Sequence, residues 1–469
     1  MRDRWIMSDV ILEAWDGPVV PVHALTEGEA QALFEAEPFV GALARTAEFK
    51  GKAGQALAVP AADGSLDRVL FGLGAEPAWT ALRALPAKLP AGVVCRIAQA
   101  PDSITPAQAA LAFALGSYRF DRYKAREGER PRLLAEGDEG AAEARQVAHA
   151  CALARDMVNT PANDMGPQQI ETIAREIAEQ HGAQVTVLEG EGLLEAGYPA
   201  VHAVGRAAHP ERAPRMIELC WAPPGGEDRP LVAIVGKGVV FDTGGLDIKP
   251  SAGMRLMKKD MGGAAHALAL GRMVMAAKLP VRLVVLVPAV ENAISGDAMR
   301  PGDVLATRKG LSVEVGNTDA EGRLILADAL ARAAELEPAL TIDLATLTGA
   351  ARIALGPQVI PFYTDDDELA GQIEAAAKAE ADAVWRMPLW KPYAEALESE
   401  VADLKNDPDA WAQAGSVTAA LFLQKFAPRG PWVHFDIFAW NPRGKPGQPA
   451  GAEVQAIRGL YRMIRERFA

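Results

Sequence analysis

Short apolar runs alternate with longer helical stretches in the second half of this chain, and that alternation restricts the fold more than any other feature. Strand-like runs occupy residues 231–236, 281–289, 311–316 and 340–346, and helical stretches occupy residues 263–279 and 324–337. Buried parallel strands appear as nearly continuous apolar runs joined by helical crossovers. The pattern predicts an α/β domain whose central sheet is mixed, mostly parallel and covered by helices.

A smaller α/β domain is predicted ahead of this one, because 469 residues exceed one ordinary domain. Its expected strands are residues 68–74 and 92–98, and its expected helices are residues 79–89 and 105–118. The charged stretch 122–140 contains Gly and Pro and is interpreted as a linker, followed by a helix over 141–157 that ends before Pro161. We therefore expect domains at 1–155 and 156–469.

Composition restricts the class of protein. The net charge of −13 disfavours a dedicated nucleic-acid binder. Three well-separated cysteines, Cys95, Cys151 and Cys220, form no CxxC pair and are typical of reduced thiols. The N-terminus lacks the apolar core of a signal peptide, and no apolar run reaches the roughly 20 residues of a membrane helix. We expect a cytoplasmic protein with no membrane partner, for which nucleic acid is an unlikely ligand.

The segment from Asn317 to Arg323 brings two carboxylates and a guanidinium together between an expected strand and an expected helix. Asp319 and Glu321 repel each other unless a positive group lies between them, and a divalent metal is the usual answer. Taken alone, the segment is also consistent with a turn in which Asp caps a helix.

A second polar segment, residues 237–263, follows the run 231–236. It contains Lys237, Asp242, Asp247, Lys249, Lys258, Lys259 and Asp260 among several glycines. Each has an ordinary alternative: Asp260 as the cap of a helix beginning near Gly262, Lys249 as a partner of Asp247, Lys237 as surface charge. Ligands bind at the carboxyl ends of strands in open α/β sheets. Lys237 and Asp242 follow the first run, residues 317–321 the third and residues 346–349 the fourth, so we expect these polar segments to meet at one edge of one sheet.

Several other kinds of site are excluded. No HExxH pair is present, so a thermolysin-like zinc site is ruled out, and His266 is interpreted as a packing residue. Gly236-Lys237-Gly238 does not extend to GxGxxG, and neither GxxxxGK[ST] nor GxSxG occurs. These absences disfavour a nucleotide-dependent enzyme and a serine hydrolase.

Together these motifs resemble the leucyl aminopeptidase family, the M17 cytosol aminopeptidases, over about residues 155–469. The matching blocks are residues 158–163, 235–238, 241–245, 248–250, 259–265, 317–323, 343–350 and 402–406. Several long motifs in the right order make this resemblance specific. It implies a smaller non-catalytic N-terminal domain with oligomer contacts, and a catalytic domain that uses two divalent metals, Mn²⁺ or Zn²⁺, in each subunit.

The resemblance also implies roles for particular residues. The metal ligands would be Lys237, Asp242, Asp260, Asp319 and Glu321, with Asp242 and Glu321 bridging the two metals around a hydroxide. Chemistry alone would make Lys237 a salt-bridge partner, because only a neutral amine can bind a metal. Lys249 would stabilise the oxyanion, and Arg323 would hold bicarbonate as general base.

For the substrate, the resemblance implies short peptides with a free N-terminus and a hydrophobic first residue. Met257, Thr346 and Gly349 would form the side-chain pocket, with Asn317 and the backbone of Leu347 contributing contacts. Residues 440–450 depart from the commoner family pattern in a region that helps line this pocket in relatives. Relatives assemble as hexamers, so a homohexamer is expected. Some also bind nucleic acid, which the acidic composition disfavours as a sole role.

Overall fold

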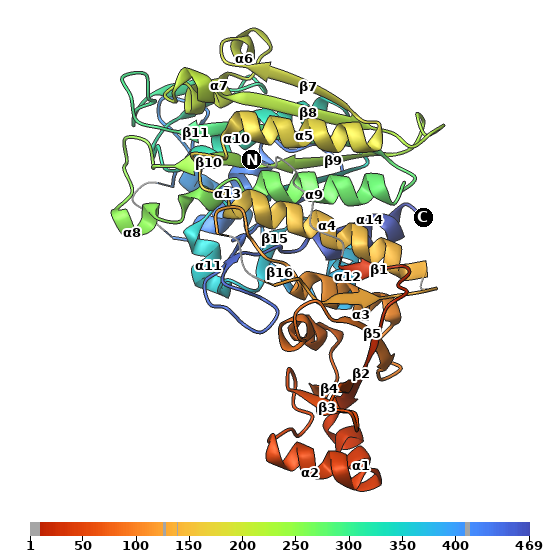
Figure 1. Cartoon of the computed structure of the whole chain (residues 1–469). Coiled ribbons are helices and arrows are strands. Elements are labelled where there is room, and N and C mark those ends of the chain that lie inside the picture. Colours follow the sequence, from red (N-terminus) through yellow and green to blue (C-terminus); the bar gives the residue numbers. More distant parts are fainter. Residues whose placement is uncertain (1–9, 125–127, 138, 409–412) are drawn as a thin grey trace. The chain divides into compact units, whose positions relative to one another are not determined.

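A computed structural model of the chain describes residues 10–124, 128–137, 139–408 and 413–469 (Figure 1). These residues form two structural units, each described by itself. The first contains the described residues up to Ala152 together with Asn441–Gly451, and the second contains Leu153–Trp440 and Ala452–Ala469.

The first unit is built on a six-stranded sheet in the order β1-β6-β5-β2-β4-β3. Its strands are β1 (Ile11–Leu12), β2 (Val20–Thr26), β3 (Ala56–Pro60), β4 (Leu66–Gly74), β5 (Val94–Gln99) and β6 (Arg132–Leu134). All neighbouring strands pair in parallel except β3 and β4. The helical elements of this unit are α1 (Glu27–Ala36), α2 (Pro38–Thr46), η1 (Trp79–Lys88) and α3 (Pro106–Gly116).

Two sequence expectations for this region were wrong in detail. The presumed linker 122–140 contains β6, which completes the parallel sheet beside β5, and a strand of three residues is too short to show a pattern in sequence. The helix expected at 79–89 is a 3-10 helix, η1, with Pro86 inside it. Proline has no N–H to donate and clashes with the preceding turn of an α-helix.

The second unit contains a nine-stranded sheet in the order β16-β15-β18-β14-β9-β11-β8-β7, with β10 paired to β11. Its strands are β7 (Gln184–Glu189), β8 (Arg215–Trp221), β9 (Leu231–Gly236), β10 (Gly238–Asp242), β11 (Arg282–Asn292), β14 (Leu340–Ala345), β15 (Ile360–Tyr363), β16 (Val384–Arg386) and β18 (Trp432–Asp436). Strands β18, β14, β9 and β11 run parallel at the centre. The expected mixed, mostly parallel sheet is confirmed.

Helices cover both faces of this sheet. Val285 of β11 faces α9 (Gly262–Ala276), where a Cβ added at Gly271 would lie 2.8 Å from Val285 Cγ2. The next residues, Val284 and Leu286, pack on the other face in a cluster with α10 (Glu321–Glu335). This is the alternation of a strand with period two. Helix α5 (Pro167–His181) lies beside α9 on the first face (Figure 1).

The strand expected at 311–316 does not join the central sheet, which corrects the prediction that the polar segments meet at the edge of one sheet. It forms β13 (Ser312–Glu314) in a separate three-stranded sheet between β12 (Val304–Ala306) and β17 (Leu404–Lys405). Only Val313 of this strand is buried, between the partly exposed Ser312 and Glu314. A strand covered on both faces needs a continuous apolar run, which this one lacks.

The remaining elements connect these layers. They are α4 (Glu139–Asn159), α6 (Gly192–Glu195), α7 (Pro199–Gly205), η2 (Pro210–Arg212), α8 (Ser251–Met254), η3 (Met257–Lys259), α11 (Gly349–Leu355), α12 (Asp367–Ala379), η4 (Lys391–Leu397), α13 (Gly415–Gln424), β19 (Trp440–Asn441), β20 (Gly451–Ala452) and α14 (Ile457–Arg467). Within the described ranges, no helix has both the length and the apolar character needed to cross a membrane.

Candidate functional site

All twelve residues singled out from the sequence line a single cavity of about 550 Å³ in the second unit. They are Lys237, Asp242, Lys249, Met257, Asp260, Asn317, Asp319, Glu321, Arg323, Thr346, Leu347 and Gly349. They come from the ends of β9, β10 and β14, from the loop between β10 and α8, from η3 and the residue after it, from the segment between β13 and α10, and from the first turns of α10 and α11. Residues that are far apart in sequence therefore share one site.

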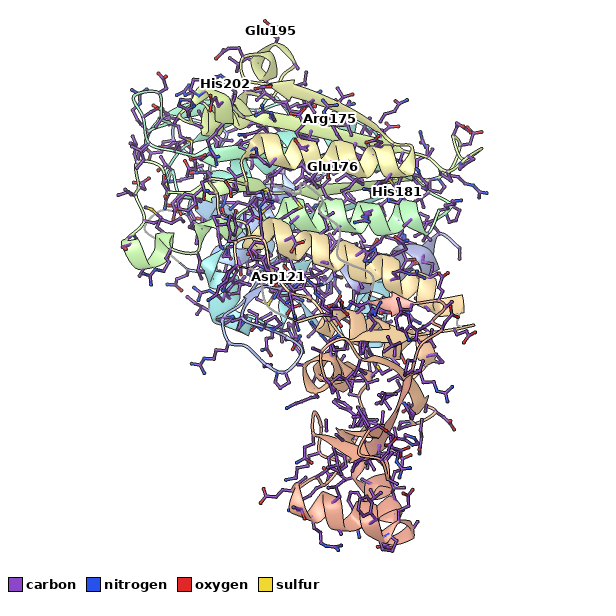
Figure 2. The ribbon with its side chains drawn as sticks, in the orientation of Figure 1. Asp121, Arg175, Glu176, His181, Glu195 and His202 are labelled. Atoms are coloured by element: carbon purple, nitrogen blue, oxygen red, sulfur yellow. The ribbon has the colours of Figure 1, made fainter. Side chains whose placement is uncertain are left out.

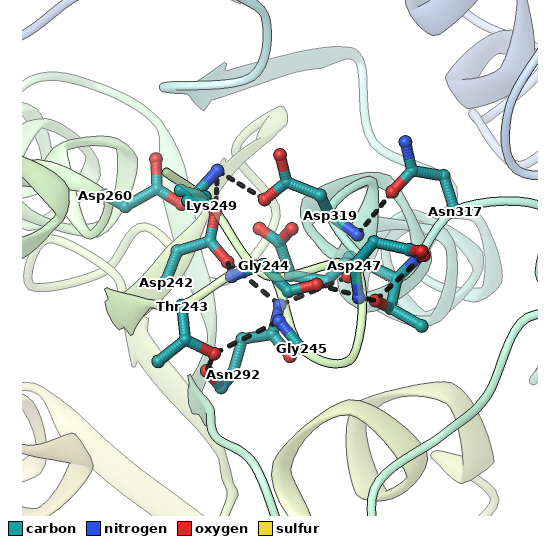
Figure 3. Close-up of polar contacts among 12 residues, drawn as sticks. Asp242, Thr243, Gly244, Gly245, Asp247, Lys249, Asp260, Asn292, Asn317 and Asp319 are labelled. Carbon is teal, nitrogen blue, oxygen red and sulfur yellow. Dashed lines mark hydrogen bonds and ion pairs between the residues drawn. The ribbon is translucent and has the colours of Figure 1, made fainter. Parts of the chain in front are cut away.

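Asp242 ends β10 and is held by two donors. Its Oδ1 accepts hydrogen bonds from Gly244 N at 2.9 Å and Asn292 Nδ2 at 2.8 Å, and its Oδ2 lies 2.8 Å from Lys249 Nζ. Lys249 also forms an ion pair with Asp319 Oδ1, so its ammonium bridges the two carboxylates (Figure 3). The alternative pairing of Lys249 with Asp247 does not occur.

The turn that carries Lys249 toward Asp242 depends on glycine. Gly244 and Gly245 have φ of +89° and +66°, and a Cβ at Gly244 would lie 2.5 Å from Asp247 O. Thr318 closes the turn, because its N–H donates to Asp247 Oδ2 at 2.7 Å and its hydroxyl donates to Gly244 O at 2.6 Å. These bonds connect the two polar segments directly.

Glu321 is the first residue of α10 and is 1% exposed. The helix begins three residues earlier than expected, which places this carboxylate in its first turn, where the helix dipole favours negative charge. Lys237, which follows β9, passes over the same turn. A Cβ at Gly322 would lie 2.5 Å from Lys237 Cε, so a larger residue there would displace the end of the Lys237 side chain.

Lys237 is 3% exposed and joins two carboxylates. Its Nζ lies 2.7 Å from Asp260 Oδ2 and 3.0 Å from Glu321 Oε1, and it donates to Thr346 O at 3.1 Å. Asp260 directly follows η3, and its Oδ1 accepts from Thr346 Oγ1 at 2.9 Å. Asp260 is therefore a member of the cluster rather than a helix cap; the residue that precedes α9 is Met261.

Four carboxylates share the two lysines Lys237 and Lys249, and this imbalance perturbs their pKa values. Burial, and then the neighbouring Asp242, raise the pKa of Glu321 to about 8 against the opposing effect of Lys237. The same two causes raise the pKa of Asp319 to about 6. Burial lowers the pKa of Lys237, but Asp260 and Glu321 outweigh it, so the net shift is upward. The cluster would be stabilised by further positive charge.

The donor set fits divalent cations. Oxygen atoms of Asp242, Asp319 and Glu321 all lie within 4.8 Å of one another. Glu321 Oε2 is buried and has neither a hydrogen bond nor an ion pair among the described residues. A buried carboxylate oxygen without a donor is costly, and coordination of a hard cation satisfies it. Asp260 and Lys237 extend the set on one side.

Arg323 lies one turn into α10, is 7% exposed and lines the same cavity. Its Nη1 donates to Asn406 O at 2.7 Å, whereas its buried Nε has no hydrogen-bond partner in the described structure. Arg323 is therefore a buried residue of the site and does not lie on the exposed surface of α10. A guanidinium with free donors facing a cavity can hold a small anion.

Asp436, at the end of β18, fixes the far wall of the cavity. Its Oδ1 accepts from Leu347 N at 3.0 Å and Thr348 N at 3.1 Å, and its Oδ2 accepts from Thr348 Oγ1 at 2.6 Å. Thr346, Leu347 and the start of α11 at Gly349 are therefore held rigidly beside the carboxylate cluster.

Sequence reasoning missed Asn292, Asn406, Asp436 and Lys259 as parts of the site. Asn406 accepts from Gly316 N at 2.8 Å and donates to Asn317 O at 2.7 Å, which holds the loop before Asp319. Asn292 and Asp436 are the last residues of β11 and β18, at the carboxyl end of the sheet. Their position at the carboxyl ends of strands was the feature by which the sequence could have identified them as site residues. Lys259 also lines the cavity.

Histidine is absent from the described lining of the cavity. His181 and His202, both labelled in Figure 2, belong to α5 and α7, and His202 lies 3.1 Å from Glu191. His266 is buried in α9, where Nδ1 donates to Gly262 O at 2.6 Å and Nε2 accepts from Gln455 N at 3.0 Å. A metal in this cavity would depend mainly on carboxylates.

Comparison with known proteins agrees with this geometry. The profile described as "Cytosol aminopeptidase family, catalytic domain" matches residues 152–461, and the profile for the M17 aminopeptidase N-terminal domain matches residues 20–135. A probable cytosol aminopeptidase of Syntrophotalea carbinolica is 43% identical over 368 residues, which cover 75% of this chain and 73% of the relative.

Solved structures show the same similarity over the whole chain. The crystal structure of a cytosol aminopeptidase from Coxiella burnetii has a TM-score of 0.92 and 41% identity, covering 98% of this chain and 100% of that one. The bottromycin maturation enzyme BotP in complex with Mn has a TM-score of 0.87 and 35% identity, covering 96% and 99%. This chain belongs to the M17 cytosol aminopeptidase family, whose members are metal-dependent hydrolases that act as aminopeptidases.

Proposed function

We propose that this protein removes the first residue from short peptides with a free N-terminus, using two divalent cations held by the carboxylate cluster. The observation that carries the proposal is the group of the buried Asp242 and Glu321 and the partly buried Asp319, in which Glu321 Oε2 has no donor among the described residues. The Mn complex of the similar enzyme BotP supports manganese as one suitable ion, with zinc as the alternative.

Each residue of the cluster takes a defined part in holding the cations. Asp242 and Glu321 lie centrally and would contact both, with Asp260 and Lys237 completing one set of ligands and Asp319 the other. Two such cations would supply a hydroxide near neutral pH and polarise the scissile carbonyl. Lys237 would have to release its proton in order to serve as a ligand. Its present contacts, to Asp260 at 2.7 Å and Glu321 at 3.0 Å, place it where positive charge is needed.

Lys249 and Arg323 act on charge that changes during the reaction. Lys249 is buried against Asp242 and Asp319, which raise its pKa above the ordinary value although burial alone would lower it. As an ammonium, Lys249 would donate to the developing oxyanion. Arg323, with its unpartnered Nε, would hold bicarbonate so that this anion accepts the proton of the attacking water.

The specificity for chain ends follows from charge. A free α-amine is the substrate group that can enter a cluster of carboxylates and cations, and internal peptide bonds lack it. The walls at Met257, Thr346 and Gly349, joined by Ile437 and Phe438, give the first side chain apolar surface. We propose that hydrophobic first residues bind against these walls.

A metal-reconstitution experiment tests the function. Metal-free protein is loaded with Mn²⁺ or Zn²⁺ and assayed with Leu-Gly and with N-acetyl-Leu-Gly. We expect cleavage of Leu-Gly only when metal is present, and no cleavage of the acetylated peptide. Glu321→Gln should abolish the activity, whereas Glu335→Gln, a surface position on the same helix paired with Arg308 at 2.7 Å, should not. Equal cleavage of the acetylated peptide would refute an aminopeptidase.

A further inference from the structure

Lys259 is a buried lysine in the cavity that the proposed reaction does not use. It is the last residue of η3, is 6% exposed and lines the cavity beside Met257 and Thr346. Its ammonium makes no hydrogen bond to any described residue. The nearest contacts of that ammonium are Asp260 Oδ1 at 3.8 Å and the ring of Phe438, whose centroid is 5.3 Å away.

Asp260 pairs with Lys259 only at 3.8 Å, because its oxygens already have closer partners. Oδ2 is paired with Lys237 at 2.7 Å, and Oδ1 accepts from Thr346 Oγ1 at 2.9 Å. In the proposed function the same carboxylate also binds a cation, which weakens its attraction for Lys259 further. A buried charge whose one ion pair is long and shared is unfavourable, so an anion that enters the cavity would gain from meeting Lys259.

We propose that Lys259 is a specificity-determining residue that binds the side-chain carboxylate of an acidic first residue, glutamate or aspartate. The inference rests on the proposed function and extends it to a substrate class. Apolar walls at Met257 and Phe438 accept the methylene groups of such a side chain, as they would accept leucine, and Lys259 adds a positive charge beside them. A pocket of this kind accepts both classes and discriminates glutamate from glutamine.

The order of groups along the chain explains why the carboxylate of a first side chain reaches Lys259. Lys259 directly precedes Asp260, the residue that would help hold the cation at which the substrate amine binds. Both residues line the cavity, so the side chain that shares a carbon with that amine would lie near Lys259. A peptide also carries a carboxylate at its C-terminus, beyond the scissile bond. Substrates without that C-terminal carboxylate show whether a preference comes from the side-chain carboxylate of the first residue.

Two neighbouring cations provide the comparisons. Lys258 precedes Lys259 but donates to Asn159 O at 2.6 Å and does not line the cavity, so Lys258→Met is the matched control. Arg352 also lines the cavity, with Cζ 5.2 Å from the Phe438 ring centroid, but it is exposed. Exposure screens its charge, so we assign the carboxylate to Lys259.

The experiment measures kcat/KM for Glu-, Gln- and Leu-p-nitroanilide, none of which has a terminal carboxylate, with the metal-loaded full chain. Glutamate and glutamine have nearly the same shape, so their ratio reports charge and does not depend on overall activity. We expect wild-type protein to favour Glu over Gln by roughly 10- to 100-fold, the range for a hydrogen bond between charged groups. Lys259→Met should reduce the ratio to about one, whereas Lys258→Met should leave it unchanged.

Other results would overturn the inference. A wild-type ratio at or below one refutes it even if Lys259→Met does not fold. A high ratio that survives Lys259→Met assigns the preference to another cation. Cleavage of the Leu substrate with no preference for Glu would refute this inference alone. Failure to cleave any of the three substrates with metal bound would refute the proposed function as well.

Discussion

Gly263→Ala tests the close approach of helix α9 to the two central strands that carry the site. A Cβ at this position would lie 2.1 Å from Leu344 O and 2.7 Å from Lys237 N. Those two atoms already form the hydrogen bond that joins β14 to the end of β9, with a length of 3.0 Å. The added methyl group therefore meets backbone on both strands, and neither neighbour can rotate away.

The size of the effect follows from these distances. Nonbonded heavy atoms are most stable at separations of roughly 3.5 Å, so the helix and β14 would have to move apart by about 1 Å. Overpacking in a core usually costs 1–3 kcal/mol, and the rigid backbone here places the change at about 3 kcal/mol or more. The same movement displaces Lys237 from Asp260 and so weakens the binding of metal.

Thermal unfolding and metal analysis of the purified variant measure both consequences. We expect the Tm to fall by roughly 5 °C or more, together with a loss of bound metal. Gly371→Ala in α12 is the control, because no atom lies within 4 Å of its added Cβ and alanine favours a helix by up to about 1 kcal/mol. An unchanged Tm and full metal content in Gly263→Ala would refute the reasoning.

Four further predictions concern the site, one buried histidine and the assembly. Glu321→Gln should lower turnover by orders of magnitude and reduce the metal bound per chain; full metal with near-normal turnover would contradict its central position. Lys249→Ala should lower kcat by roughly 10²–10³ with both metals retained, and loss of metal would instead make it a ligand or a structural residue. Burial lowers the pKa of His266 to about 4, so the unfolded chain binds the proton more readily than the folded chain does. The contribution of this residue to stability is therefore complete above about pH 6.5 and is lost as the pH falls toward 4. At pH 5 the free energy of unfolding should have dropped by roughly 2 kcal/mol more in wild type than in His266→Gln. The glutamine keeps a donor for Gly262 O and an acceptor for Gln455 N. Equal losses for the two proteins in denaturant titrations would exclude protonation of His266 as the cause. Sedimentation should give a homohexamer about six times the 49.7 kDa chain mass, and a fully active monomer would disprove it.

Local pattern alone was sufficient for much of the fold. The continuous apolar run at 231–236 predicted β9, because strands buried on both faces are mostly apolar. The strand-like run at 340–346 predicted β14, although this buried strand also contains Thr341 and Asp343. The helix expected over 141–157 is α4, and its end near Pro161 follows from the restriction that proline places on the residue before it. Burial and backbone restriction act over a few residues, and such effects are visible in sequence.

Pattern was insufficient where strands are short or half polar. Residues 312–314 have one buried side chain, and the short β6 interrupts a charged stretch. The sequence of neither segment indicates which sheet it joins, because strand pairing depends on which sheet edge the rest of the fold leaves unpaired. The separate sheet of β13, and the place of β6 beside β5, were decided by tertiary structure.

For the site, the sequence by itself indicated which residues line the cavity, since acidic and basic groups concentrated in glycine-rich segments at strand ends are typical of a ligand site. The partners of those residues were decided only by the tertiary structure. Lys249 lies two residues from Asp247, yet it pairs with Asp242 and Asp319, and Lys237 meets Glu321 from a different element. The strength of a charge pair depends on separation in space and on burial, and both are set when β9, β10 and α10 converge.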